Sequence, residues 1–201
     1  MVKISIVEIK LSLLLHLNSI DTNSEIRKLE PTRTVIMGLN RRQTTENFKY
    51  RSIPKGDINI ILSFHYYSPY AFTHYKTNWT EFNELGIGTN YPGWAIDKTH
   101  GTIDDEKKRT TIEKWTKYSL EKEIMLAVDI SQKYGLKLFY GEFGCFPSTS
   151  DEQRLRWYND IIEIFNKQNI AWSHWNYKND FPLVDPSTLK PNKDFISILM
   201  K

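Results

Sequence analysis

The stretch that decides the fold reads Leu136-Lys137-Leu138-Phe139-Tyr140-Gly141-Glu142-Phe143-Gly144. Its first half is apolar enough for a buried parallel strand, and its second half places a carboxylate between two glycines. In barrels of alternating strands and helices, functional groups lie at the carboxyl ends of the strands, because the loops there form the open face. The stretch therefore predicts an α/β fold with Glu142 at the functional end of a parallel strand.

Helical patterns separate this strand from three further strand candidates, at residues 34–38, 58–67 and 170–177. One helical pattern covers residues 111–134 and ends at Gly135, a residue suited to a C-terminal cap. Another begins at Ser150-Asp151-Glu152-Gln153, which has the pattern of a capping box. Strands that alternate with helices in this way predict a parallel sheet.

The candidate strand 58–67 also indicates which of its faces is covered. One alternate set is apolar or aromatic and is expected to lie under helices: Ile58, Ile60, Leu62, Phe64 and Tyr66. The other set becomes polar toward the carboxyl end, through Ser63, His65 and Tyr67. We expect this set to face a barrel interior, together with Ile61, Leu138 and Ala171. Residues 68–109 follow as a long segment rich in aromatic residues, which favours an ordered functional loop.

The composition excludes several classes of protein. A length of 201 residues fits one domain, and a net charge of +3 is too small to indicate binding to nucleic acid. Cys145 is the single cysteine, so no internal disulfide can form. We expect no membrane span, since no apolar run approaches the length of one. The apolar stretch 4–17 is not expected to be a signal peptide, since Glu8 and Lys10 interrupt it and no small-residue cleavage site follows. The sequence has no convincing metal-ligand spacing and no glycine-rich phosphate loop, so we expect no cofactor.

Three motifs at strand ends occur in a fixed order along the chain: Ser63-Phe64-His65-Tyr66-Tyr67, Gly141-Glu142-Phe143-Gly144 and Trp172-Ser173-His174-Trp175-Asn176-Tyr177-Lys178. Together they resemble the second half of glycoside hydrolase family 5, the cellulase family of retaining enzymes on an eightfold barrel. The resemblance covers roughly residues 26–201. It implies a glycoside hydrolase that acts on β-1,4-glucan or a related polysaccharide and needs no cofactor.

The resemblance also implies a role for each matching residue. Glu142 would be the nucleophile, Tyr67 would donate a hydrogen bond to its carboxylate, and His65 would order the polar network beside it. Trp175 would form the stacking floor under the sugar. Three further residues would bind substrate: His74, Trp79 and Lys178.

The acid/base glutamate of the family is the main departure from the pattern. In the family it lies in an Asn-Glu-Pro motif after the fourth strand, and this chain has Lys10-Leu11-Ser12-Leu13-Leu14-Leu15-His16-Leu17-Asn18-Ser19 where that motif should be. A complete barrel has eight strands and about 250 residues. We therefore expect the C-terminal half of a TIM-type (β/α)8 barrel, with strands 5–8 and their helices. Truncation or a shifted reading frame would explain it.

This expectation divides the chain in two. Residues 24–201 would be a partial catalytic domain, and residues 1–23 an atypical segment outside the native family sequence. If the chain nevertheless contains an acid, its first candidates are Glu8, Glu25 and Glu30. Full-length members of the family are usually exported, but the sequence leaves the localisation of this chain open.

Plain structural alternatives stay open for each residue. Glu142 could be a solvated turn carboxylate, His65 a satisfied core histidine and Trp175 a core aromatic. His74 and Trp79 could be a hydrogen-bonded histidine and a packed aromatic of the loop. For the whole chain three hypotheses follow: a hydrolase with weak or no activity alone, an inactive carbohydrate-binding module, and a half-barrel that forms homo-oligomers through open sheet edges.

Overall fold

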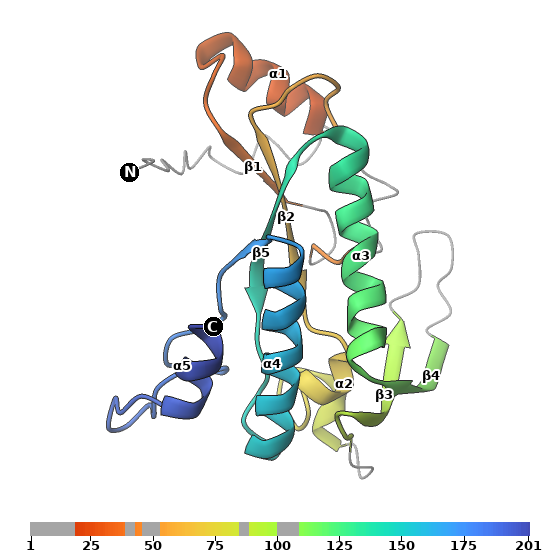
Figure 1. The fold of residues 1–201 in the computed structure, drawn as a ribbon, viewed down its shortest axis with the longest axis vertical. Helices are drawn as coiled ribbons and strands as arrows, with labels where there is room; N and C mark the ends of the chain where they lie inside the picture. Colours follow the sequence, from red (N-terminus) through yellow and green to blue (C-terminus); the bar gives the residue numbers. More distant parts are fainter. Residues whose placement is uncertain (1–18, 39–42, 46–52, 85–88, 100–108) are drawn as a thin grey trace.

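The structure is a computed structural model that describes residues 19–38, 43–45, 53–84, 89–99 and 109–201 (Figure 1). The elements occur in the order α1 (Ser19–Leu29), β1 (Val35–Gly38), β2 (Ile60–Tyr66), α2 (Tyr70–Thr73), η2 (Glu81–Glu84), β3 (Gly93–Thr99), β4 (Arg109–Trp115), α3 (Lys117–Tyr134), β5 (Lys137–Phe143), α4 (Asp151–Lys167), β6 (Ala171–Trp172) and α5 (Lys193–Leu199).

The four predicted strands form one parallel sheet in the order β1-β2-β5-β6. Helices α3 and α4 lie side by side along this sheet (Figure 1). Helix α1 lies at the end where the strands begin, whereas α2 and the β3–β4 hairpin lie at the end where they stop (Figure 1). The carboxyl ends of the strands therefore share one edge with the loops expected to carry function.

The alternation predicted for β2 is confirmed with one exception. Ile60, Leu62, Phe64 and Tyr66 are buried in the main hydrophobic core, which includes residues of α3 and α4. Ile58 is 81% exposed, because it precedes the first residue of the strand.

One inward residue was also assigned to the wrong face. Leu138 is buried in the same core as Tyr140, two positions further along β5, so its side chain lies on the helix-covered face. Ile61 is half-buried and Ala171 is exposed, in agreement with the uncovered face expected for them.

Residues 111–115 were predicted as helix but form the end of β4. This strand pairs antiparallel with β3, for example Trp94 with Lys114, and α3 begins only at Lys117. The predicted C-terminal cap at Gly135 is confirmed, with a left-handed φ of 65°. The segment 68–109 is not a bare loop, since it contains α2, η2 and β3.

The predicted capping box of α4 does not form. Ser150 precedes the helix, but its side chain makes no capping hydrogen bond. Gln153 instead accepts a hydrogen bond from the Tyr91 backbone N–H at 3.1 Å and donates one to Asn90 Oδ1 at 3.2 Å. A tertiary contact has replaced the local one. The last predicted strand is also shorter than expected, since β6 comprises only Ala171–Trp172.

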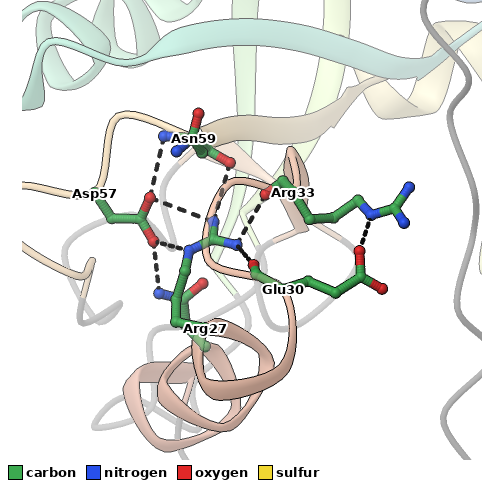
Figure 2. A network of polar contacts seen from close by, with 6 residues as sticks. Arg27, Glu30, Arg33, Asp57 and Asn59 are labelled. Atoms are coloured by element: carbon green, nitrogen blue, oxygen red, sulfur yellow. Dashed lines mark hydrogen bonds and ion pairs between the residues drawn. The ribbon is translucent and has the colours of Figure 1, made fainter.

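Arg27 ties the end of α1 to the turn before β2 (Figure 2). Its Nε donates to Asp57 Oδ2 at 2.7 Å, and Asn23 Nδ2 donates to the same oxygen at 2.8 Å. Its terminal nitrogens donate to the backbone carbonyl oxygens of Arg33 and Asn59. Burial raises the pKa of Asp57, but the hydrogen bonds from Arg27 and Asn23 outweigh it and lower the pKa overall. This clamp joins α1 to the amino-terminal edge of the sheet.

The boundary expected between residues 23 and 24 stays a prediction. Residues 1–18 lie outside the described part of the chain, and α1 begins at Ser19. No helix of the described residues is long and apolar enough to cross a membrane.

Candidate active site

Three of the predicted site residues meet at the carboxyl edge of the sheet. The Tyr67 hydroxyl donates a hydrogen bond to Glu142 Oε2 at 3.1 Å, and His65 Nδ1 lies 3.2 Å from the same oxygen. Among the described residues, no donor reaches the other oxygen, Oε1. The carboxylate is thus held by one oxygen, while the second is left for another partner.

A β-bulge in β5 brings Glu142 to this place. Phe64 pairs with Tyr140, but His65 pairs with Glu142, so β5 carries one extra residue, Gly141. Side chains alternate between the faces of a regular strand, which would turn Glu142 toward the helices. The extra residue changes the alternation and places Glu142 beside His65.

Two serines surround the bulge, and both lie on the uncovered face. Ser173 Oγ donates to the Gly141 carbonyl oxygen at 2.5 Å. A Cβ atom on Gly141 would lie 2.9 Å from Ser63 Oγ, which is closer than such atoms approach. A larger residue at position 141 would therefore force Ser63 Oγ to move, and sequence reasoning missed this constraint because it depends on pairing with a distant strand.

The two groups beside Glu142 Oε2 are uncharged near neutral pH. Burial and the Glu142 carboxylate raise the pKa of Tyr67 well above its ordinary value, so its hydroxyl keeps its proton. Burial lowers the pKa of His65 and outweighs the opposing effect of Glu142. Neither group therefore places a positive charge beside the carboxylate.

Trp175 follows β6 at the same edge and is 44% exposed. Its backbone N–H donates to the Phe143 carbonyl oxygen at 2.9 Å. A Cβ atom on Gly144 would lie 2.3 Å from the Trp175 carbonyl oxygen, so only glycine allows this close approach. The main chain of Trp175 is therefore fixed directly beside the end of β5, and its ring offers an exposed aromatic surface.

The remaining predicted residues lie at different depths. His74 is only 5% exposed. Its ring stacks on Tyr70 with a centroid distance of 3.8 Å and packs against the Tyr67 ring at 5.0 Å. Trp79 is 49% exposed and Lys178 is exposed. The roles of all three in binding sugar stay predictions.

Phe181 connects these aromatic residues and was missed by sequence reasoning. Its buried ring lies 5.7 Å from Tyr67, 5.2 Å from His74 and 6.4 Å from Trp79. It also lies 6.1 Å from Phe146. The only sequence signal for it was its place shortly after the Trp172–Lys178 motif.

An open cleft of about 770 Å³ adjoins this aromatic cluster. Phe146 and Pro147 line it from the loop after β5, and Asn179, Asp180 and Asp185 line it from the segment after Trp175. Its volume is within the range of pockets that bind small ligands, about 300–1,000 Å³. Across the described residues, no group of three or more His, Cys, Asp or Glu side chains is placed to hold a metal ion.

The candidate acids suggested by sequence are poorly placed. Glu25 lies in α1 and pairs with Lys28, and Glu30 pairs with Arg33 just before β1. Both precede β1, whose first residue Val35 is level with Ile60, whereas Glu142 is level with His65, five residues further along β2. We therefore discard these two candidates. Glu8 lies outside the described residues.

Comparison with known proteins agrees with the geometry. Residues 20–181 match the family model described as Cellulase (glycosyl hydrolase family 5). Endoglucanase C of Acetivibrio thermocellus is 28% identical over 182 residues, which cover 88% of this chain and 53% of that protein. The chain thus spans about half the length of this relative.

Solved structures give the same picture. The crystal structure of endoglucanase Cel5A from the hyperthermophilic Thermotoga maritima superposes with a TM-score of 0.72 at 25% identity, covering 89% of this chain and 52% of that one. A complex of Thermotoga maritima Cel5A with mannotriose gives the same TM-score at 24% identity and the same coverage. Both are structures of a protein about twice as long as the matched region.

Proposed function

The chain belongs to glycosyl hydrolase family 5, and from this premise we propose that it is a retaining glycoside hydrolase of the cellulase type. The observation that carries the proposal is the Glu142 carboxylate at the end of β5, with Tyr67 and His65 both on Oε2. The Tyr67 hydroxyl and the neutral imidazole both lie against Oε2, so the second oxygen of the carboxylate is turned toward a substrate. That is the arrangement expected of an oriented nucleophile.

In the first step, Oε1 of Glu142 attacks the anomeric carbon of the sugar. The new bond joins this carbon to the carboxylate, while the bond to the glycosidic oxygen breaks and its electron pair leaves with that oxygen. A natural glucan needs a proton on the leaving oxygen, because a sugar alkoxide is a poor leaving group. An activated phenolate leaves without it.

In the second step, water attacks the same carbon and gives up a proton to the surrounding solvent, while the bond from that carbon to Glu142 breaks and its electron pair returns to the carboxylate. Two displacements at one carbon give net retention of configuration. Among the residues that the structure describes, no acid has been identified, so we propose weak or no activity on natural glucan for the 201 residues alone. A positioned general acid contributes about 10²–10⁴-fold.

The substrate class that fits is a β-1,4-linked glucan or a related polysaccharide. The exposed rings of Trp175 and Trp79 supply apolar faces on which sugar rings stack, and Lys178 supplies a hydrogen-bond donor. Because the Thermotoga maritima neighbour has been crystallised with mannotriose, mannan oligosaccharides belong in the same test.

We further propose that the parallel sheet is the carboxyl-terminal half of a barrel, with β1, β2, β5 and β6 as strands 5–8. Three observations support this: four parallel strands in sequential order, a site at their carboxyl edge, and a match to half of longer relatives.

Labelling with a mechanism-based inhibitor tests the proposed nucleophile. A dinitrophenyl 2-deoxy-2-fluoro-cellobioside has a leaving group that needs little acid, so it should label Glu142 slowly. Peptide mass spectrometry should find the adduct on Glu142, with none in Glu142→Gln and full labelling in the control Glu152→Gln. A label on another residue, or one formed only after denaturation, would remove the assignment.

A second candidate is a carbohydrate-binding module without catalysis, which is favoured because no acid has been identified within the described part of the chain. A dinitrophenyl cellobioside separates the two, since its turnover does not need the acid. Turnover of this substrate that disappears in Glu142→Gln supports the enzyme. Binding of cellotriose without any turnover supports the module. Ordinary rates on carboxymethyl cellulose would show that this chain contains an acid after all.

A further inference from the structure

One tyrosine hydroxyl on α4 is bonded to both segments that carry the site. The backbone N–H of Cys145 donates to the Tyr158 hydroxyl at 2.9 Å. The same hydroxyl lies 2.9 Å from Nε2 of His174. Cys145 comes three residues after Glu142, and His174 directly precedes Trp175. Tyr158 thus bridges the segment that carries Glu142 and the segment that carries Trp175, whose exposed ring we call the platform.

The chemistry of these groups fixes the direction of each hydrogen bond. His174 Nδ1 lies 3.1 Å from the Asn176 carbonyl oxygen, which can only accept, so Nδ1 carries the proton. In a neutral imidazole, Nε2 then has no proton, so it accepts a hydrogen bond from the Tyr158 hydroxyl. The hydroxyl oxygen in turn accepts from Cys145. In this series of three hydrogen bonds from Cys145 to Asn176, each donor has one acceptor, so none of the bonds can reverse its direction.

The surroundings keep His174 neutral, as this arrangement requires. Burial is the main cause that lowers the pKa of His174 to about 4, and the Arg154 guanidinium acts in the same direction against the hydrogen bond to Asn176. Arg154 is itself buried, bonded to Asp151 at 2.9 Å and placed over the Phe195 ring at 4.5 Å. This cation is therefore a fixed part of the fold.

The bridge acts on the position of Trp175 relative to Glu142. Trp175 lies between His174 and Asn176, and the His174 ring is bonded to the carbonyl of Asn176, so the imidazole spans the main chain around Trp175. On the other side, the Trp175 N–H is bonded to Phe143, the residue after Glu142. Movement of either segment would break bonds in both.

We propose that Tyr158 and His174 are positioning residues that hold the Trp175 platform in register with Glu142. Neither needs to touch the sugar, since both act through hydrogen bonds to the main chain on either side of the site. The proposal rests on the proposed function only for its effect on sugar binding. The placement of Trp175 itself can be measured without any substrate.

The variant Tyr158→Phe removes the bridging hydroxyl and keeps the ring. In the 201-residue chain labelled with 5-fluorotryptophan, the ¹⁹F resonance of Trp175 is identified by its loss in Trp175→Phe. Tyr158→Phe should shift or broaden this resonance while that of Trp94 stays in place. Cellotriose affinity should fall roughly threefold to tenfold, the effect of losing one to two hydrogen bonds.

Tyr91→Phe is the matched control. Tyr91 also donates its hydroxyl to α4, to Asp160 at 2.6 Å, but it has no bond to the platform segment. It should lower stability by a similar amount and leave the Trp175 resonance unchanged. An unchanged Trp175 resonance in folded Tyr158→Phe would overturn the proposal.

A measurement on the unmodified chain covers the case in which Tyr158→Phe does not fold. The ¹⁵N shifts of the His174 ring should show the neutral form protonated at Nδ1, and a proton on Nε2 would overturn the bridge. If the unmodified chain binds no cellotriose but Trp175 responds to Tyr158→Phe, the proposed function fails and the positioning role stands. If cellotriose binds and Trp175 does not respond, the positioning role fails alone.

Discussion

His65 Nδ1 lies 3.2 Å from Glu142 Oε2, and the two residues are partners in register only because Gly141 adds one residue to β5. The nucleophile proposed for this chain therefore depends on the pairing of two strands that are more than 70 residues apart in sequence. The two groups that contact its carboxylate come from one of these strands and the residue that follows it.

Gly141→Ala should disturb this arrangement, because the added Cβ would lie 2.9 Å from Ser63 Oγ. We expect a loss of about 1–3 kcal/mol in the free energy of unfolding, typical of overpacking, and slower labelling of Glu142. Urea denaturation and intact-mass kinetics measure the two effects. The double variant Ser63→Ala/Gly141→Ala makes room and should recover most of both. Failure of this rescue would show that Ser63 is not the obstacle.

Tyr67→Phe should slow the labelling of Glu142 roughly tenfold, since a lost hydrogen bond to a charged group leaves the carboxylate less well oriented. Stability should change little. The matched control is Tyr66→Phe, which removes the neighbouring hydroxyl bonded to Glu123 on the helix-covered side. It should lower the melting temperature without changing the labelling rate. Equal labelling rates in the two variants would contradict the role of Tyr67.

Local sequence patterns predicted the features of the fold that local interactions determine, such as the covered face of a strand and the end of a helix. The alternation of Ile60, Leu62, Phe64 and Tyr66 identified the covered face, and Gly135 ended its helix as expected. Residues 111–115 were assigned to a helix because the helical pattern begins there. Pairing with β3 overrides that local preference.

The site followed the same division. The resemblance to the family implied that Glu142, His65 and Tyr67 lie together, and the structure brings them together. The bulge at Gly141 could not be predicted, because it exists only in the register of two strands. The ring of Phe181 likewise acquires its place through contacts with loops distant in sequence.

The Arg27 clamp should matter for stability and not for chemistry. Arg27→Ala leaves Asp57 mostly buried without its cation, and we expect a loss of about 2–3 kcal/mol in the free energy of unfolding. Lys28→Ala, next in sequence, breaks only an exposed pair with Glu25 and should cost less than about 0.5 kcal/mol. Thermal and urea unfolding measure both. Similar losses in the two variants would contradict a buried clamp.

Acid should destabilise the protein through His174. Its pKa is about 4 in the folded chain and 6.5 as its ordinary value, so between these pH values the unfolded state binds more protons. The contribution of His174 to stability is therefore fully present above pH 6.5 and is lost as the pH drops toward 4. From pH 7.5 to 4.5 the contribution of this residue is about 2–3 kcal/mol.

Urea unfolding of the unmodified chain and His174→Gln at both pH values tests this. The variant should be less stable at pH 7.5, because it loses the bridge, but should lose less on acidification. Parallel losses in the two proteins would show that His174 does not titrate in this range.

We expect the chain to associate with copies of itself through its open sheet edges. β1 and β6 are the end strands of the described sheet, and Ile36 of β1 is 42% exposed. Light scattering should show dimers or larger species that grow with concentration. Ile36→Lys should reduce them, whereas Leu126→Lys on α3 should not. A compact monomer at all concentrations, with a cooperative thermal transition, would rule out edge association.

The way Trp175 is attached has a consequence for how this site can change over time. Its position depends on a backbone N–H bonded to Phe143 and on the bare α-carbon of Gly144, neither of which involves the indole ring. A different side chain at position 175 would inherit the same anchorage. The site can therefore exchange the surface it offers to a sugar by a single substitution, while the frame that presents this surface stays as it is.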